Sequence, residues 1–125
     1  MRIVCLDDNS LIVDITTALL EELGHDVLPS LHPDHALDLL RTSPAPIDLL
    51  ITDVHLGGGV DGREIARSAQ RIIPGIRIIC FTGDTELSQF DDGWVVLRKP
   101  CTLGLLEQAI DQTAPCRRPF PLRAR

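Results

Sequence analysis

Short apolar runs alternate with longer amphipathic stretches along most of the chain. Five runs are about as long as an average β-strand and consist mainly of Ile, Val and Leu; they lie at residues 2–6, 26–29, 47–52, 76–81 and 94–97. The run at 47–52 is apolar without alternation, which is typical of a strand buried on both faces of a parallel sheet. The pattern therefore predicts five strands in a sheet that is covered on both faces.

The stretches between the strands carry apolar residues at helical spacing, together with helix start and stop signals. Four helices are expected. The first begins after Asn9 or Ser10 and ends at Gly24, the second begins at Pro33, the third ends before Pro74, and the fourth begins after Thr102 and ends near Pro115. Their expected apolar positions are Leu11, Ile12, Ile15, Ala18, Leu19 and Leu23, then Ala36, Leu37 and Leu40, then Ile65, Ala66, Ala69 and Ile72, and finally Leu103, Leu106, Ala109 and Ile110.

The regular alternation of strands and helices predicts an α/β fold, a parallel sheet with helices on both faces. A further helix between the fourth and fifth strands would have to form from residues 85–92, which are few and acidic and are ended by Gly93. We expect that helix to be short or degenerate. Residues 1–114 should form one domain, and residues 115–125, which contain proline and arginine, should be a loosely ordered tail.

Charge is distributed unevenly along the chain. The net charge is −6, but residues 1–114 hold 18 acidic and eight basic side chains, a balance of −10. An acidic body argues against direct nucleic-acid binding as the main role. The first residues contain too short an apolar run for a signal peptide, and no stretch approaches the roughly 20 apolar residues of a membrane span. We therefore expect a cytoplasmic protein with no membrane partner.

The four cysteines do not form a metal or disulfide pattern. Cys5, Cys80, Cys101 and Cys116 include no C-x-x-C pair, and no cluster of Cys and His has the spacing of a zinc finger. Cys5 and Cys80 fall inside apolar runs, where a reduced cysteine behaves as a small hydrophobic residue. We expect structural thiols.

Polar side chains follow the predicted strands at their carboxyl ends, which is where open parallel sheets bind ligands. In chain order these are Asp7 and Asp8, then Asp53, then Thr82 and Asp84, and then Lys99, which is the only lysine of the chain. Two carboxylates about 4 Å apart repel each other by roughly 4 kcal/mol at an effective dielectric near 20. A cluster of three therefore calls for a cation, and such hard oxygen ligands suit Mg²⁺.

A metal-bound carboxylate that faces a lysine and a hydroxyl has the composition of a phosphoryl-acceptor site. The metal ion, the ammonium and the hydroxyl can each meet one oxygen of a transferring phosphoryl group. No other cofactor is expected.

The same strand ends carry sequence motifs. LDDN after the first strand, LLITD at the end of the third, CFTG at the end of the fourth and KP after the fifth resemble the response-regulator receiver family, in the family's order. The resemblance runs from Arg2 to about Thr113. It implies a flavodoxin-like, doubly wound sheet of five parallel strands in the order 2-1-3-4-5.

The resemblance also implies a metal site. By this likeness Asp8, Asp53 and the backbone carbonyl of His55 would ligate Mg²⁺, and Asp7 would hold a metal-bound water.

For the phosphoryl group, the resemblance implies that Asp53 is the acceptor, that Thr82 bonds a phosphoryl oxygen after a movement, and that Lys99 pairs with the phosphate. The protein would then be a switch and not an enzyme, assisting only its own phosphorylation and dephosphorylation. The donor would be a sensor histidine kinase or a histidine phosphotransfer protein. We expect a stand-alone receiver that is a monomer or weak dimer. It would signal to a partner protein or serve as a phosphate sink.

Three departures from the family pattern affect the output rather than the site. Only seventeen positions separate Thr82 from Lys99, more than a helical turn fewer than usual. Val96 stands where the family commonly has a switch aromatic. The loop HLGGGVDG lacks the usual proline and has one apparent extra residue. We expect phosphorylation to act by reordering residues 85–92.

Two other functions are weighed against this one. A phosphohydrolase of the haloacid-dehalogenase type also uses strand-end Asp, Thr and Lys. However, it needs a second Asp two residues after the first, where this chain has His55, and its acidic pair comes last rather than first. A flavodoxin-like cofactor binder shares the fold, but Asp7 and Asp8 would repel its phosphate.

Overall fold

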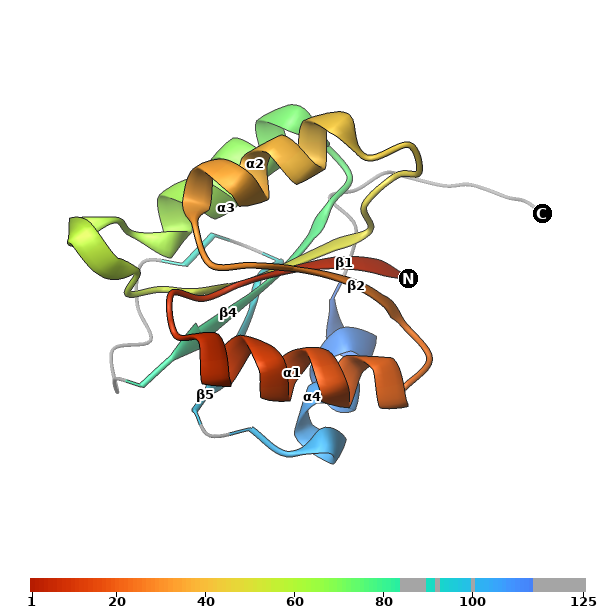
Figure 1. Ribbon diagram of the computed structural model, residues 1–125. Coiled ribbons are helices and arrows are strands. Elements are labelled where there is room, and N and C mark those ends of the chain that lie inside the picture. The colour runs from red at the N-terminus through yellow and green to blue at the C-terminus, as the bar shows by residue number, and fades with distance from the viewer. Residues whose placement is uncertain (84–89, 92, 100, 114–125) are drawn as a thin grey trace.

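The computed structural model describes residues 1–83, 90–91, 93–99 and 101–113 (Figure 1). Its elements, in chain order, are β1 (Arg2–Leu6), α1 (Ser10–Glu22), β2 (Asp26–Ser30), α2 (Pro33–Thr42), β3 (Leu49–Asp53), a 3₁₀ turn η1 (Gly57–Gly59), α3 (Gly62–Ile72), β4 (Arg77–Thr82), β5 (Val95–Arg98) and α4 (Leu103–Gln112). The five predicted strands and the four predicted helices are all present. Strand boundaries shift by at most two residues.

The five strands form one parallel sheet in the order β2-β1-β3-β4-β5. Helices α1 and α4 cover one face and α2 and α3 cover the other, as Figure 1 shows. The predicted fold class and strand order are therefore confirmed. The strand order brings β1 and β3 side by side although two helices and a strand separate them along the chain.

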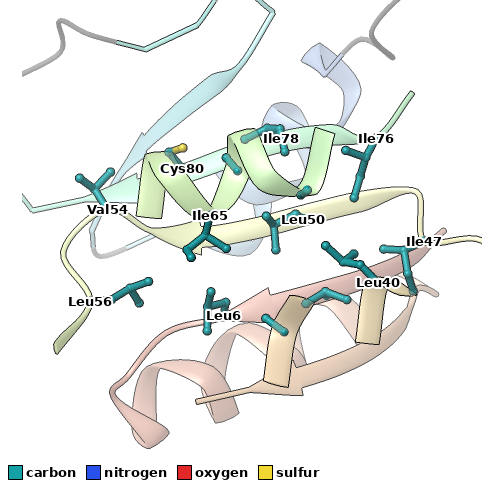
Figure 2. Packing of buried hydrophobic residues seen from close by; sticks show 14 residues of the cluster. Leu6, Leu40, Ile47, Leu50, Val54, Leu56, Ile65, Ile76, Ile78 and Cys80 are labelled. Carbon is teal, nitrogen blue, oxygen red and sulfur yellow. The ribbon is translucent and has the colours of Figure 1, made fainter. Parts of the chain in front are cut away.

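Each face of the sheet has its own apolar core. The core beneath α2 and α3 draws its side chains from β1, α2, β3, α3 and β4, and Figure 2 shows them meeting in one layer. The other core lies between the sheet and the helices α1 and α4. All five residues of β3 are buried, as its consecutive apolar residues Leu49, Leu50 and Ile51 indicate. Burial on both sides holds the end of β3 in place, and Asp53 is its last residue.

The apolar face predicted for α1 is correct only in part, because Leu19 and Leu23 pack against the core but Leu11 and Ile15 are largely exposed. The buried residues of α1 are Val13, Thr16 and Leu20, whereas Leu11 is 63% exposed and Ile15 is 49% exposed. Apolar residues cover more than half of this helix, so spacing alone allows more than one inward row. The row three and four positions apart that begins at Val13 packs best against the sheet.

Two buried thiols behave as the sequence predicts. Cys5 and Cys80 are free and lie in the two cores, and burial raises the pKa of each thiol to about 12. Cys101 is half-buried, and Cys116 lies outside the described residues. At neutral pH the two buried thiols are protonated and poor nucleophiles.

The connection between β4 and β5 is where prediction and structure overlap least. The helix expected from residues 85–92 falls mostly outside the described residues, as does the tail at 115–125. Phe90 and Asp91, which are described, are not helical, and Phe90 and Trp94 pack against the core beneath α2 and α3. Among the helices that are described, none is both long enough and apolar enough to span a membrane.

Candidate functional site

Three aspartates meet at the carboxyl edge of the sheet. Asp53 ends β3 and Asp7 directly follows β1, and the pairing of Leu6 with Thr52 places these two positions next to each other. Oxygens of the Asp7, Asp8 and Asp53 carboxylates all lie within 4.8 Å of one another. Asp7 is 2% exposed and Asp53 is 7% exposed, whereas Asp8 is open to solvent.

Lys99 supplies the positive charge of this cluster. Its Nζ lies 3.0 Å from Asp7 Oδ2 and 3.0 Å from Asp53 Oδ2. The backbone N–H of Lys99 donates to the carbonyl of Thr82, so the end of β4 holds the base of the lysine in place. Burial of the ammonium lowers the Lys99 pKa, but hydrogen bonds to Asp53 and Asp7 and the charges of both outweigh it, so the pKa is raised. Lys99 is therefore fully charged at neutral pH.

One ammonium does not balance three carboxylates. The pKa of Asp7 is raised, chiefly because burial disfavours its charge; the Asp53 charge raises it further, and hydrogen bonds from Asn9 and Lys99 only partly oppose this. Within the described part of the chain, the Asp8 carboxylate has no hydrogen-bond or ion-pair partner, although it lies beside the other two. The cluster thus has an excess of negative charge and one open ligand group.

Asp7→Asn tests this excess. A pKa that is higher in the folded than in the unfolded state means that stability is greatest below the unfolded pKa and is lost as pH rises through the folded pKa. In EDTA, the free energy of unfolding of the wild type should therefore fall as pH rises above the ordinary range of an aspartate, and Asp7→Asn should flatten that fall. Urea unfolding at a series of pH values measures it. An unchanged pH profile in the variant would show that Asp7 is not the carboxyl whose raised pKa lowers stability at higher pH.

Backbone contacts fix the carboxyl end of β3, where Asp53 lies. The N–H of Val54 donates to the Phe81 carbonyl at 2.9 Å, and the N–H of Gly62 donates to the Val54 carbonyl at 2.8 Å. A Cβ on Gly62 would overlap the backbone carbonyl of Asp53. Only glycine allows α3 to begin this close to Asp53.

The loop between Asp53 and α3 folds back on itself. Its three glycines form a 3₁₀ turn in which Gly58 and Gly59 have φ of 73° and 77°, the left-handed region that favours glycine. His55 and Asp61 form an isolated antiparallel bridge across the base of the loop. The N–H of His55 also donates to Asp53 Oδ1 at 3.3 Å. The glycines thus give the loop a defined shape beside the aspartates.

The structure brings together Asp7, Asp8, Asp53 and Lys99, four of the residues that the sequence singles out. Thr82 is buried at the end of β4, in the strand next to Asp53, and the side chain of His55 is exposed. Asp84 lies outside the described residues.

The sequence prediction misses two contributions to the site, since it names Asn9 only as a possible helix cap and does not name Gly62 at all. Asn9 caps α1 with its side chain while its N–H donates to Asp7 Oδ1 at 3.0 Å, and Gly62 allows the close approach to Asp53. The pairs Asp8-Asn9 and Asp61-Gly62, each directly before a helix, were the available signals for them.

The donor set of this edge suits a hard divalent cation. Carboxylate oxygens within 4.8 Å of one another, one of them open to solvent, are the ligands that Mg²⁺ prefers. An ammonium and a buried hydroxyl residue at neighbouring strand ends can stabilise negative charge that develops on a group transferred to Asp53.

Comparison with known proteins places this arrangement in a family. The family model of the response regulator receiver domain matches residues 3–111. The CAI-1 autoinducer sensor kinase/phosphatase CqsS of Vibrio cholerae is 31% identical over 87 residues, which cover 68% of this chain and 12% of CqsS. The transcriptional regulatory protein ComA of Bacillus subtilis is 26% identical over 92 residues, 73% of this chain and 43% of ComA. The chain thus spans less than half of either relative.

Solved structures agree. The response regulator receiver protein from Sinorhizobium medicae WSM419 superposes with a TM-score of 0.80 at 28% identity, covering 90% of this chain and 92% of that one.

Proposed function

This chain belongs to the response regulator receiver domain family, and on that premise we propose that it is a signalling switch in which Asp53 accepts a phosphoryl group. The observation that carries the proposal is the contact of one ammonium, Lys99, with two carboxylates, of which Asp53 ends the central strand. Backbone hydrogen bonds of the next residue, Val54, to Phe81 and Gly62 hold this strand end in place.

The proposed reaction is a transfer between two protein side chains. A carboxylate oxygen of Asp53 attacks the phosphorus of a phosphohistidine on the donor protein, the P–N bond breaks as the O–P bond forms, and the histidine nitrogen leaves with the electron pair. Lys99 then exchanges its bond to Asp53 Oδ2 for a bond to the new phosphoryl group. The hydroxyl of Thr82 is proposed to bond another phosphoryl oxygen, because the strand pairing puts Thr82 one residue beyond the partner of Asp53.

Mg²⁺ is the proposed cofactor. Asp8, Asp53 and the carbonyl of His55 would ligate it, and Asp7 would hold one of its waters, in agreement with the open Asp8 carboxylate and with the raised pKa of the buried Asp7. When bound, the ion neutralises carboxylate charge and stabilises charge on the transferred group. The loop shape set by Gly58 and Gly59 keeps the backbone of His55 beside Asp53.

The proposed partners are a sensor histidine kinase or a histidine phosphotransfer protein as donor and a protein of unknown identity as target. Kinase signalling is named in the CqsS relative and regulation in the ComA relative, which supports this reading. A role as a phosphate sink would use the same chemistry without a target.

Metal dependence tests the function and its ligands together. With acetyl phosphate as donor, the wild type should gain the mass of one phosphoryl group in Mg²⁺ and little in EDTA. Mg²⁺ should also raise the melting temperature, because only the folded state offers the site. Asp8→Ala should lose both responses while keeping its fold in EDTA, with a slight gain in stability from relieved repulsion.

The matched control is Asp14→Ala, which removes an exposed aspartate one turn into α1 and should leave both responses intact. An undiminished Mg²⁺ shift in Asp8→Ala would contradict the ligand set. Equal labelling in Mg²⁺ and in EDTA would contradict metal-assisted transfer.

A further inference from the structure

Two aromatic residues of the connection between β4 and β5 pack against the core beneath α2 and α3. Phe90, Asp91, Gly93 and Trp94, here called the aromatic strap, precede β5 without forming a helix. Phe90 and Trp94 are half-buried against the core beneath α2 and α3. The strap therefore rests on the same core as α3, although some 20 residues separate them along the chain.

Two arginines of α3 hold the strap. The guanidinium of Arg63 lies 5.6 Å from the centre of the Phe90 ring, and that of Arg67 lies 5.6 Å from the centre of the Trp94 ring. Both distances are within the range of cation–π attraction. Arg67 also donates to both carboxylate oxygens of Asp91, each at 3.3 Å.

Arg63 has a second contact that Arg67 lacks. Its Nε lies 3.0 Å and 3.1 Å from the two oxygens of Asp61, and its Nη2 lies 2.7 Å from Oδ2. A planar fork that meets both oxygens fixes the relative position of the two side chains, which a lysine cannot do. Hydrogen bonding to Arg63 lowers the pKa of Asp61, so this pair stays ionised at neutral pH.

Asp61 is the last residue of the loop between Asp53 and α3, residues 54–61, here called the acceptor loop. Its backbone bridges to His55 and its side chain caps α3 at the glycine that touches the Asp53 carbonyl. Arg63 therefore contacts, with one guanidinium, both the end of the loop beside Asp53 and the first aromatic ring of the strap. Arg67 hydrogen-bonds to Asp91 of the strap and to Glu64; its charge helps to lower the pKa of Asp61, but among the described residues it makes no hydrogen bond to the loop.

The strap has a feature that favours movement. The indole Nε1 of Trp94 is buried, and the described residues offer it no hydrogen-bond partner. Burying an N–H donor without a hydrogen-bond partner costs free energy. A rearrangement that exposes this N–H or gives it a partner removes that cost. Position 96 in β5 is Val, so no aromatic side chain is present there to carry a signal by rotation.

We propose that Arg63 couples the phosphorylation state of Asp53 to the aromatic strap. The coupling rests on the proposed function. A phosphoryl group on Asp53 forms a new bond with Lys99 and shifts the backbone of the acceptor loop, and Asp61 moves with the loop. The guanidinium of Arg63, which is bound to Asp61, transmits the shift to Phe90 and on to Trp94. Arg63 is a positioning residue in this scheme and touches none of the reacting atoms. The strap is the surface that changes.

Trp94 reports on the strap directly. It is the only tryptophan of the chain, which has no tyrosine, so the emission of the whole protein comes from one ring of the strap. The probe is beryllofluoride with Mg²⁺, a mimic of the acyl phosphate, and its binding is followed separately by fluorine NMR. On binding, the wild type should show a shift of the emission maximum and a change of intensity.

Arg63→Ala should bind beryllofluoride as the wild type does and lose most of the emission change. Arg63→Lys keeps a cation near Phe90 without the fork and should restore only part of it. Arg67→Ala is the matched control, because it alters the starting spectrum of Trp94 but leaves the link to Asp61 in place, and it should keep the change. Phe90→Leu keeps an apolar side chain and should lose the change as Arg63→Ala does, which provides a second route if Arg63→Ala folds poorly.

The outcomes separate the two proposals. If the wild type binds beryllofluoride with no change at Trp94, or if both Arg63→Ala and Phe90→Leu keep the full change, the coupling is wrong and the proposed function stands. If the wild type neither binds beryllofluoride nor takes a phosphoryl group from acetyl phosphate, the proposed function fails and the coupling fails with it.

Discussion

Asp53→Asn should take up no phosphoryl group from acetyl phosphate in Mg²⁺, whereas the wild type gains one. An amide nitrogen and a neutral carbonyl oxygen replace the anionic nucleophile, and neither attacks phosphorus at a useful rate. The variant should stay folded, because Asn fills the same space at the end of a strand whose other four residues are buried and apolar or hydrogen-bonded. Intact-protein mass spectrometry measures the gain.

The matched control is Asp111→Asn, which changes an exposed aspartate of α4 and should be labelled like the wild type. Labelling of Asp53→Asn to the wild-type level would show that another carboxylate is the acceptor. If Asp7 or Asp8 is labelled in Asp53→Asn but not in the wild type, a neighbouring aspartate accepts the phosphoryl group only after Asp53 is lost.

Lys99→Met should be the most destabilising single substitution at the site. Asp7 and Asp53 are almost fully buried and both depend on the Lys99 ammonium. Removing one partner of a buried charge pair leaves uncompensated charge, which costs about 3 kcal/mol. Urea unfolding in EDTA at neutral pH measures the loss, and saturating Mg²⁺ should recover part of it, because the ion would neutralise the same carboxylates.

The loss in Lys99→Met should also depend on pH. The raised pKa of Asp7 means that this carboxyl takes up a proton at a higher pH than an ordinary aspartate, so the difference between wild type and variant should shrink on acidification. Arg98→Met, which removes an exposed cation at the adjacent position, is the matched control and should cost less than about 1 kcal/mol. A loss in Lys99→Met as small as in this control would mean that Lys99 is an ordinary surface charge.

The site residues that can be predicted from sequence are those that lie directly after a predicted strand. Buried apolar runs mark the strands, and parallel strands in one sheet bring the residues after them to one edge, so the chain pattern alone groups Asp7, Asp53 and Lys99. The LDDN and LLITD motifs add the strand order through a family resemblance.

The parts that sequence reasoning missed depend on close packing. The inward row of α1 begins at Val13 and not at Leu11, because several apolar rows were available and only three-dimensional packing selects one. The approach of Gly62 to the Asp53 carbonyl is a contact between backbones, which no side-chain pattern records.

The Arg63 and Arg67 contacts escaped prediction for a related reason. Phe90 belongs to a segment for which a short helix was expected, and Trp94 was expected to begin the fifth strand, so neither ring was assigned to a contact with α3. The positions of Phe90 and Trp94 depend on the core beneath α2 and α3 and on the two arginines of α3, which only the whole fold brings together.

The identity of the acceptor is the central claim, and trapping the phosphoryl group chemically tests it most directly. After incubation with acetyl phosphate and Mg²⁺, borohydride reduces the acyl phosphate and leaves homoserine where the phosphorylated aspartate stood. Peptide sequencing by mass spectrometry should find homoserine at position 53 and at no other aspartate. Homoserine at another position, with Asp53 unmodified, would contradict the account.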